Sequence, residues 1–298
     1  MYTFSIIIPH RNIPTLLRRC LDSIPHRDDV QIIVIDDNSD ANKVDFSKFP
    51  GLNEKNTEVY FTKEGKGAGY TRNVGLKHAK GEWLLFADAD DMFMPQIEDA
   101  FEFCSKSHAD VIYLGSCAKD SETLEPSNEM DPEKTILDSY LNDRCYDIKY
   151  RIHHPWGKFI KHSFIIKNNI IFEEVSCSND TRFSVQSDYY ANLIDVFPAE
   201  VYCYMVRSDS LWHNVNLEWA RTRFGVMLRV ALFFDKKGVD SQKTRFVNNA
   251  RVYLGIIRNY SLFYYYIGLL KLVTLTGIRK EYINSAIKKI KRKVLKCK

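Results

Sequence analysis

Three carboxylates follow directly after a short apolar run. The run Trp83-Leu-Leu-Phe-Ala87 is typical of a strand buried on both faces, and Asp88, Asp90 and Asp91 come at its carboxyl end. Strand geometry would place Asp88 and Asp90, at positions i and i+2, on the same side. Two carboxylates in this arrangement can bind a divalent ion that also binds phosphates. The alternative is a polar turn that closes a strand, so the neighbouring segments must decide.

Two earlier strands are also expected to end in polar residues. Buried-strand patterns cover Phe4 to Pro9 and Val30 to Ile35, and apolar residues follow a helical spacing over Thr15 to Ile24. This order predicts a βαβ unit with a parallel sheet and a right-handed crossover. The segments Pro9-His-Arg-Asn12 and Asp36-Asp-Asn-Ser39 would then share one sheet edge with the carboxylates, where open α/β sheets bind ligands.

A glycine-rich loop precedes the next expected helix. Gly65-Lys-Gly-Ala-Gly69 leads into a helix-forming segment over Thr71 to Ala79. Its backbone, beside Lys66 and Arg72, could hold a phosphate at the helix N-terminus. Taken alone, however, three glycines in five residues are more often only a turn.

Together these segments resemble family 2 inverting glycosyltransferases, which have the GT-A nucleotide-sugar-binding fold. Pro9-His-Arg-Asn12 stands where the family has P-x-Y-N, and Asp36-Asp-Asn-Ser39 matches D-D-x-S. Gly67-Ala-Gly-Tyr-Thr-Arg-Asn-Val-Gly75 matches G-x-x-x-A-R-N-x-G, and Asp88 to Asp91 match the metal motif D-x-D-D. The motifs occur in order near the N-terminus, and the resemblance extends more weakly to Ser210.

The resemblance implies a nucleotide site. Asp37 would accept a hydrogen bond from the uracil imide, with the backbone of Pro9 beside the base. Arg72 would lie near the nucleotide. Arg11 stands at a nucleotide-binding position, but the family usually has an aromatic residue there, so base stacking by Arg11 is in doubt.

The resemblance also implies a metal site. Asp88 would face the ribose or the metal, and Asp90 would bind Mn²⁺ or Mg²⁺ directly. The ion would bridge the diphosphate and neutralise charge on the leaving nucleotide. In some relatives a histidine from the region of His213 reaches the diphosphate or the metal, although a single histidine is more often structural.

An inverting transfer needs a general base, because the acceptor hydroxyl attacks the anomeric carbon in a single displacement. Ser178-Asn-Asp-Thr-Arg-Phe183 occupies the place of the family's E-D-x-x-F motif, which aligns Asp180 with the base and puts Asn179 in the place of Glu. Asp188 is the nearest competitor, but on a helix it would as easily be solvated. The apolar face expected for this helix consists of Phe183, Val185, Tyr189, Leu193 and Ile194.

The segment His153 to Ile160 resembles the family's W-x-K-L segment on the acceptor side. Its two adjacent histidines would point apart, so they do not suggest a metal site. Trp156 could stack on a sugar face or fill a core beside Phe159. Glu122 to Asp131 is polar and contains proline, which is typical of a loop.

Composition narrows the class of protein. With 298 residues, 45% of them apolar, the chain can form one large domain or a domain with an appendage. Its seven cysteines are scattered without a C-x-x-C pair, which suggests neither a disulfide framework nor a zinc site and fits a reducing cytosol. The N-terminus lacks the pattern of a signal peptide, so we expect a cytoplasmic protein.

The net charge of +4 conceals an asymmetry. Residues 279–298 carry nine Lys or Arg against one Glu, and the other 278 residues sum to −4, which argues against a nucleic-acid partner. The tail therefore predicts a basic amphipathic helix for peripheral contact with an anionic membrane, the alternative being an ordinary surface helix. Its apolar stripe consists of Ile283, Ile287, Ile290 and Val294.

The sequence therefore predicts an α/β, GT-A-like, mostly parallel sheet flanked by helices over residues 1–210 and a helical region over 211–298. Leu262 to Ile278 is apolar, but Lys271 interrupts it, and the pieces are shorter than the roughly 20 residues that a membrane span needs.

The expected function is metal-dependent, inverting transfer of a sugar from a UDP-sugar to a hydroxyl of a glycan or lipid-linked saccharide. Surface polysaccharide synthesis at the inner face of the cytoplasmic membrane is the expected setting. A nucleotidyltransferase is the first alternative, but it would carry a basic glycine-rich loop directly after the first strand. A non-catalytic nucleotide-sugar-binding subunit is the second, and Asn179 slightly favours it.

Overall fold

The structure, a computed structural model, describes residues 2–143, 148–207 and 215–276. The chain divides into two compact units, one of residues 1–175 with 179–210, and one of residues 176–178 with 211–298. The division into domains over residues 1–210 and 211–298 remains a prediction. The predicted tail helix and His213 lie outside the described residues.

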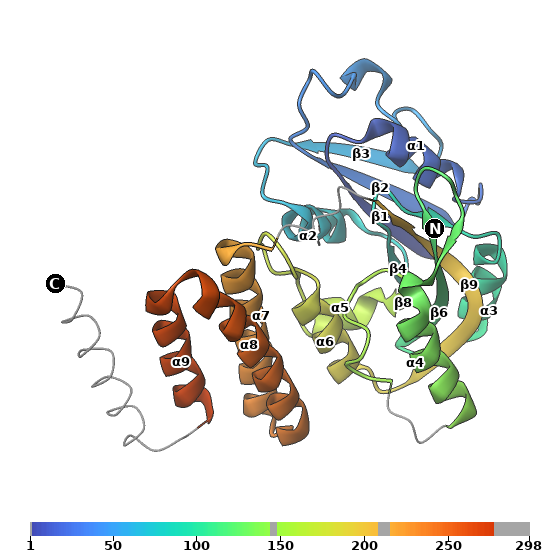
Figure 1. Cartoon of the computed structure of the whole chain (residues 1–298). Coiled ribbons are helices and arrows are strands. Elements are labelled where there is room, and N and C mark those ends of the chain that lie inside the picture. Colours follow the sequence, from blue (N-terminus) through green and yellow to red (C-terminus); the bar gives the residue numbers. More distant parts are fainter. Residues whose placement is uncertain (1, 144–147, 208–214, 277–298) are drawn as a thin grey trace. The chain divides into compact units, whose positions relative to one another are not determined.

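The first unit is built on one mixed β-sheet (Figure 1). Its strands lie in the order β3-β2-β1-β4-β8-β6-β9-β5, and β7 pairs with β6. The strands are β1 Phe4–His10, β2 Val30–Asp37, β3 Thr57–Thr62, β4 Trp83–Phe86, β5 Met92–Phe93, β6 Val111–Asp120, β7 Pro126–Ser127, β8 Lys158–Lys161 and β9 Ile194–Val206. The helices and 3-10 turns of this unit are α1 Pro14–Asp22, η1 Phe46–Lys48, α2 Ala68–His78, α3 Ile97–Lys106, η2 Asn128–Met130, α4 Asp131–Asn142, α5 His162–Lys167 and α6 Thr181–Tyr190.

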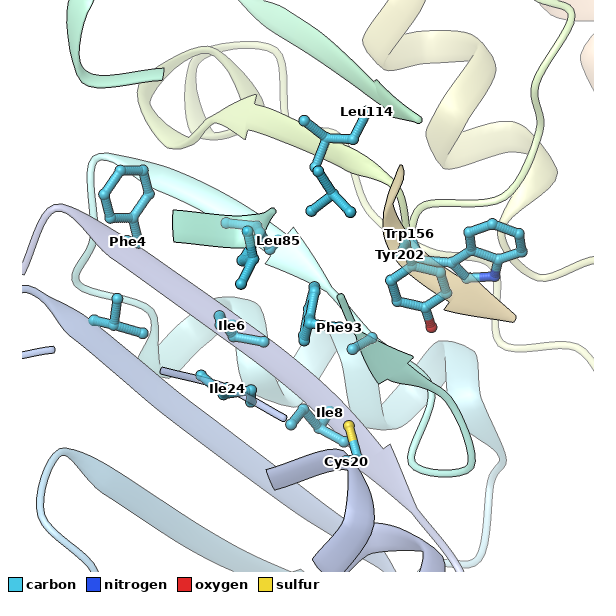
Figure 2. Close-up of a cluster of buried hydrophobic side chains, with 14 of the residues drawn as sticks. Phe4, Ile6, Ile8, Cys20, Ile24, Leu85, Phe93, Leu114, Trp156 and Tyr202 are labelled. Carbon is cyan, nitrogen blue, oxygen red and sulfur yellow. The ribbon is translucent and has the colours of Figure 1, made fainter. Parts of the chain in front are cut away.

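The sheet separates two apolar cores. Because successive side chains of a strand alternate between faces, Ile6 and Ile8 of β1 pack on one side and Ile7 on the other. The first core includes apolar residues of α1 and α3, and Figure 2 shows part of it. The second core includes residues of α4, α5 and α6, with α2 packed against it. A strand buried on both faces explains the continuous apolar run of β1.

The predicted parallel βαβ unit is confirmed. Strand β1 pairs in parallel with β2 and with β4, so His10 lies opposite Asp36 and Ile7 opposite Phe86. The polar segments after the three strands therefore share one sheet edge. The sheet becomes antiparallel where β8 inserts between β4 and β6, while the longest pairing of that half, between β6 and β9, is again parallel.

One predicted helix ends earlier than expected. Helix α6 stops at Tyr190, Leu193 is half exposed, and Ile194 begins strand β9, so these last two residues do not belong to a helical face. The segment after Ile194 is rich in β-branched and aromatic residues and pairs with β6 along its length, and this pairing prevails over the helical spacing. The predicted loop over residues 122–131 contains β7 and η2.

In the second unit, the described residues 215–276 form the helices α7 Leu217–Lys237, α8 Asp240–Tyr260 and α9 Leu262–Thr276. The Asn216 side chain caps the start of α7 by accepting a hydrogen bond from the backbone N–H of Trp219, and Gly238 ends α7 in the left-handed conformation. Among the described helices, none is long and apolar enough to cross a membrane.

Candidate functional site

The loop after β1 is held to the loop after β2 by a buried polar cluster. The Nδ1–H of His10 donates to Asp36 Oδ1 at 2.8 Å, and its Nε2 accepts from the backbone N–H of Ile13 at 3.1 Å. Ser39 Oγ donates to the same Asp36 oxygen and accepts from the Asn12 backbone N–H. Burial would raise the pKa of Asp36, but the hydrogen bonds from His10 and Ser39 outweigh it and lower that pKa.

Asp37 is held at the start of α2. Its two carboxylate oxygens accept the backbone N–H groups of Lys66, at 3.0 Å, and Gly67, at 2.7 Å. Each oxygen keeps a second lone pair for a ligand. These two N–H groups are therefore already used, so a phosphate at this loop would have to be bound by other groups, such as the Lys66 side chain.

Two glycines allow α2 to lie close to its neighbours. A Cβ on Gly75 would lie 2.4 Å from Ile7 Cγ2 on the sheet, and a Cβ on Gly69 would lie 2.1 Å from the backbone oxygen of Glu173. A larger residue at either position would displace α2. The glycines of this motif therefore fix the helix that carries Arg72.

Arg72 joins the metal motif to the segment with the candidate base. Its Nη2 donates to Asp88 Oδ1 at 2.5 Å, and its Nη1 donates to Asn179 Oδ1 at 2.8 Å. Asn179 accepts this bond through a neutral amide oxygen. The glutamate that the family has at this position would have been a second carboxylate partner for Arg72, beside Asp88. Because Asp37 is bound at the N-terminus of α2, one helix holds Asp37 and Asp88.

Asp88 to Asp91 form a turn and do not extend the strand. Strand β4 ends at Phe86, and the Asp91 N–H donates to the Asp88 backbone oxygen at 3.0 Å. The strand alternation that was expected to place Asp88 and Asp90 on one side does not apply to them, because β4 ends at Phe86 and these residues lie in the turn. Asp90 instead pairs with Arg207, from Nη1 to Oδ2 at 3.0 Å.

The third carboxylate of the turn, that of Asp91, has a structural role. Asp91 is fully buried and accepts from the Tyr202 hydroxyl at 2.6 Å and from the Met205 N–H at 2.8 Å. The same hydroxyl accepts the Asp88 N–H at 3.0 Å, so Tyr202 fixes both ends of the turn. Burial, with the charges of Asp90 and Asp88, raises the pKa of Asp91 well above its usual range.

Trp156 belongs to the core and not to a sugar subsite. Its ring is stacked between His154, with ring centroids 3.3 Å apart, and Tyr202, 4.7 Å apart, and it is 7% exposed. Figure 2 shows Trp156 beside Tyr202. With both faces covered, it cannot stack on a sugar, and it supports the tyrosine that holds the Asp88–Asp91 turn.

The two candidate bases differ in what they bind. Asp188, for which the sequence allowed either a competing base or a solvated residue, is fully buried and accepts from Tyr113 Oη at 2.6 Å and Tyr150 N at 2.9 Å. Asp180 stands at the N-cap of α6, but its side chain does not cap the helix. Its carboxylate is therefore not engaged in holding α6.

Electrostatic interactions also link Asp88, Asp90 and Asp180 at this sheet edge. Burial raises the pKa of Asp180, the positive charges of Arg72 and His154 oppose this, and Asp88 adds to it. Burial and the charge of Asp88 also raise the pKa of Asp90, against the effect of Arg207. Asp88 thus acts on both carboxylates, as expected for groups that share one site.

The carboxylates fit a divalent ion that completes its coordination with substrate. Within the described ranges, no group of three His, Cys, Asp or Glu side chains could hold a metal by itself. Mg²⁺ and similar ions are commonly bound by one or two carboxylates together with phosphate oxygens and water. Asp88 and Asp90 supply this number of protein ligands.

The other predicted nucleotide-binding residues are at least partly exposed to solvent. Pro9 is half buried at the end of β1, Arg11 is exposed, and Lys66 is exposed with its Nζ 4.9 Å from the centre of the Tyr70 ring. Sequence reasoning missed the roles of His10, Arg207 and Tyr202. His10 lay within a recognised motif, but Tyr202 and Arg207 are on or next to β9, which carries no motif.

Comparison with known proteins identifies the first part of the chain. Residues 5–167 match the family described as Glycosyl transferase family 2. The chain is 28% identical over 220 residues to the poly(ribitol-phosphate) beta-N-acetylglucosaminyltransferase TarS of Staphylococcus aureus. That match covers 70% of this chain and 36% of TarS, so the chain matches only about a third of this relative.

Solved structures share the fold. Residues 1–349 of S. aureus TarS, crystallised with UDP-GlcNAc, align with a TM-score of 0.65 and 24% identity, covering 83% of this chain and 72% of that one. The mannosyltransferase PcManGT of Pyrobaculum calidifontis, solved with GDP-Man and Mn²⁺, aligns with a TM-score of 0.54 and 14% identity, covering 96% and 83%. The α/β architecture is thus that of GT-A TarS.

Proposed function

This chain belongs to glycosyl transferase family 2, and we propose that it transfers a sugar from a UDP-sugar to a hydroxyl of a glycan or lipid-linked saccharide, with inversion. The observation that carries the proposal is the position of Arg72, which binds both Asp88 and the residue next to Asp180. Helix α2 thereby links the donor-side carboxylates Asp37 and Asp88 to the segment that carries the candidate base Asp180.

On the donor side, Asp37 accepts the uracil imide N–H, and the Pro9 backbone lies beside the base. Asp37 is suited to this because two backbone N–H groups fix its carboxylate while each oxygen keeps a free lone pair. Arg11 and Lys66 are exposed at this edge and contact the nucleotide and its phosphates. The UDP-GlcNAc complex of TarS, which has this fold, supports a nucleotide-sugar donor.

Asp90, with Asp88, would hold Mn²⁺ or Mg²⁺ between the protein and the diphosphate. The bound ion would neutralise negative charge on the leaving UDP. Each carboxylate has an arginine partner, Arg72 for Asp88 and Arg207 for Asp90. Because a cation and an arginine compete for the same oxygens, we expect these arginines to turn toward the diphosphate when it binds with the ion. His213 remains a further proposed ligand.

Asp180 is the proposed general base. Its carboxylate removes the proton of the acceptor hydroxyl as that oxygen attacks the anomeric carbon and the bond to the diphosphate breaks. Its raised pKa makes it a better proton acceptor than an ordinary aspartate, provided that it is ionised when the acceptor binds. Asp188 is a poorer candidate for this role, because it is fully buried and both of its carboxylate oxygens already accept hydrogen bonds from the fold.

The acceptor is proposed from the relatives. TarS is named for transfer to poly(ribitol-phosphate), which supports a surface-polysaccharide acceptor for this chain. We place the reaction at the inner face of the cytoplasmic membrane, with residues 279–298 as a peripheral contact. The cytoplasmic location follows from the cysteine pattern, and the contact from the charge of +8 on that segment.

The test is UDP release from UDP-sugars in the presence of Mn²⁺ and candidate acceptors. Asp90→Ala should abolish release, whereas Asp99→Ala, at an exposed position on α3, should leave it unchanged. Release of pyrophosphate in place of UDP would indicate a nucleotidyltransferase. Binding of UDP-sugar without turnover on any acceptor would indicate a non-catalytic subunit.

A further inference from the structure

Arg19 of α1 donates hydrogen bonds to two segments that are far from it in the sequence. Its Nη2 donates to the backbone oxygen of Asp90, in the turn of the metal motif, at 2.7 Å. Its Nη1 donates to the backbone oxygen of Ser121 at 3.0 Å, and Nη2 also donates to Ser121 Oγ at 3.1 Å. Ser121 follows directly after β6. The planar, charged guanidinium thus joins α1 to the metal motif and to the end of β6.

The hydrogen bonds around Asp90 form a closed circuit. Arg207, directly after β9, donates to Asp90 Oδ2 at 3.0 Å. The backbone N–H of Ser121 donates to the backbone oxygen of Val206, the neighbour of Arg207, at 2.9 Å. The circuit therefore runs from the backbone of Asp90 through Arg19, Ser121 and the end of β9 to the Asp90 carboxylate. It fixes Asp90 relative to the ends of β6 and β9.

The two arginines bind different parts of Asp90. Arg207 binds the carboxylate, so a metal ion must compete with it for the same oxygens. Arg19 binds the backbone oxygen and leaves the carboxylate to other partners. The Asp90 side chain is 32% exposed, so an ion can reach it. The bond from Arg19 can therefore persist when an ion takes the place of Arg207.

Tyr202 does not make the same contact. Its hydroxyl binds the N–H of Asp88 and the carboxylate of Asp91, which are the two ends of the turn. Asp90 lies between these ends, and Arg19 holds its carbonyl. A metal ligand binds well only when surrounding groups fix its direction.

We propose that Arg19 is a positioning residue for the metal site. It holds the backbone of Asp90, so that the carboxylate keeps its direction toward the ion after Arg207 has turned away. This inference rests on the proposed metal site of Asp88 and Asp90. The alternative is that Arg19 acts only through its charge. The two have opposite consequences, because removing a nearby positive charge would strengthen cation binding, whereas losing the anchor weakens it.

The test measures binding of Mn²⁺ alone to the full chain, from the electron paramagnetic resonance signal of the free ion. Arg19→Lys keeps the charge but not the planar fork that reaches both carbonyls, and it should raise the Kd for Mn²⁺ roughly tenfold. Arg19→Gln loses the anchor together with a repelling charge, so it should raise the Kd by a smaller factor, about threefold. If Arg19 acted only through its charge, the Lys variant would equal the wild type and the Gln variant would bind Mn²⁺ more tightly.

Arg18 provides the matched control. It precedes Arg19 on α1, but it is ion-paired with Asp22 and Glu54. Arg18→Lys and Arg18→Gln make the same chemical changes without touching the circuit around Asp90. Both should leave the Kd for Mn²⁺ within about twofold of the wild type, because solvent and salt screen an exposed charge.

Uridine affinity separates positioning from general damage to the fold. Uridine has no phosphate, and its proposed partner is Asp37, so isothermal titration should give the same uridine affinity for the wild type and the Arg19 variants. A parallel loss of uridine and Mn²⁺ binding would mean that Arg19 only supports the fold, and it would overturn the proposal.

Ser121→Ala is a milder variant of the same circuit. It removes the Oγ acceptor of Arg19 and leaves both backbone acceptors in place. It should raise the Kd for Mn²⁺ about twofold, because one hydrogen bond is lost. Combined with Arg19→Lys it should add almost nothing, since the contact is already broken. Fully additive effects would contradict the circuit.

Asp90→Ala distinguishes failure of this inference from failure of the metal site. It should abolish Mn²⁺ binding. If the wild type does not bind Mn²⁺, or if Asp90→Ala binds it equally well, both proposals are wrong. If Asp90→Ala loses the ion while Arg19→Lys keeps wild-type affinity, the metal site stands and the role of Arg19 is overturned.

Discussion

Asp180 and Asp188 are two aspartates that differ both in exposure and in their partners, because Asp180 is half-buried and Asp188 is fully buried. The carboxylate of Asp188 accepts hydrogen bonds from Tyr113 and Tyr150, whereas that of Asp180 does not cap its own helix. An aspartate whose lone pairs are used by the fold contributes stability, and one left available can accept a substrate proton. At the scale of single residues, exposure and hydrogen bonding therefore separate the two candidates in the same direction.

Asp180→Asn should lower transfer by a factor of about 10² to 10⁴, the usual contribution of a general base. The affinity for UDP-sugar with Mn²⁺ should change by no more than a few-fold, because the carboxylate acts on the acceptor. UDP release and isothermal titration with UDP measure the two effects. A large loss of UDP affinity, with turnover restored at saturating donor, would place Asp180 on the donor side.

The pH dependence should reflect the raised pKa of Asp180. The base works only when ionised, so activity should fall as pH decreases through that pKa, and the acidic limb should lie above the ordinary value of about 4. Profiles of kcat/KM against pH measure this limb. Asp180→Glu should move the limb if Asp180 is the titrating group, and an unmoved limb would assign it to another carboxylate.

Asp188→Asn should destabilise the fold. An amide can accept through one oxygen only, so either the Tyr113 hydroxyl or the Tyr150 N–H loses its acceptor in a buried site. The expected loss is about 1–3 kcal/mol of unfolding free energy, measured by urea denaturation. Asp99→Asn, on the surface of α3, is the control and should change it by less than about 0.5 kcal/mol.

At the scale of elements, α2 organises the site. Its N-terminal loop binds Asp37, its second turn carries Arg72, and Gly75 brings it against Ile7 of the sheet. The β9 strand has the complementary role, because Tyr202 holds both Asp88 and Asp91. The sheet edge that carries the candidate site is thus fixed from one side by a helix and from the other by a strand.

Gly75→Ala should therefore affect stability and donor binding together. The added methyl would lie 2.4 Å from Ile7, so α2 must shift, at a cost of about 1–3 kcal/mol. Urea denaturation and UDP titration measure the two consequences. Gly255→Ala on α8 makes the same change where a Cβ meets nothing, and it should raise stability by up to about 1 kcal/mol. Equal effects of the two variants would contradict the role assigned to α2.

At the scale of the whole molecule, metal and nucleotide should stabilise the fold cooperatively. Mn²⁺ alone must displace Arg72 and Arg207 from Asp88 and Asp90, whereas UDP offers these arginines a new partner. Mn²⁺ and UDP together should therefore raise Tm more than the sum of their separate effects, and EDTA should reverse the gain. Additive shifts, or a wild-type response in Asp90→Ala, would contradict the proposed metal site.

The sequence by itself determined the parallel half of the sheet and the residues at its edge. Strands β1, β2 and β4 are short apolar runs with polar ends, and α1 has a helical spacing, so local periodicity was sufficient. The family resemblance supplied motifs in the same segments, and the match over residues 5–167 confirms it. These features depend on residues that are close together in the sequence, so the sequence is sufficient to predict them.

Only the tertiary structure decided which of these residues are free to act. The bond from Tyr202 to Asp91 joins residues 111 positions apart, and those from Asp188 to Tyr113 and from Arg72 to Asn179 span 75 and 107. No local pattern encodes such contacts, because they arise when β9 and α6 pack on the sheet. For the same reason Trp156, a sugar-stacking candidate in sequence, became a core residue once His154 and Tyr202 covered its two faces.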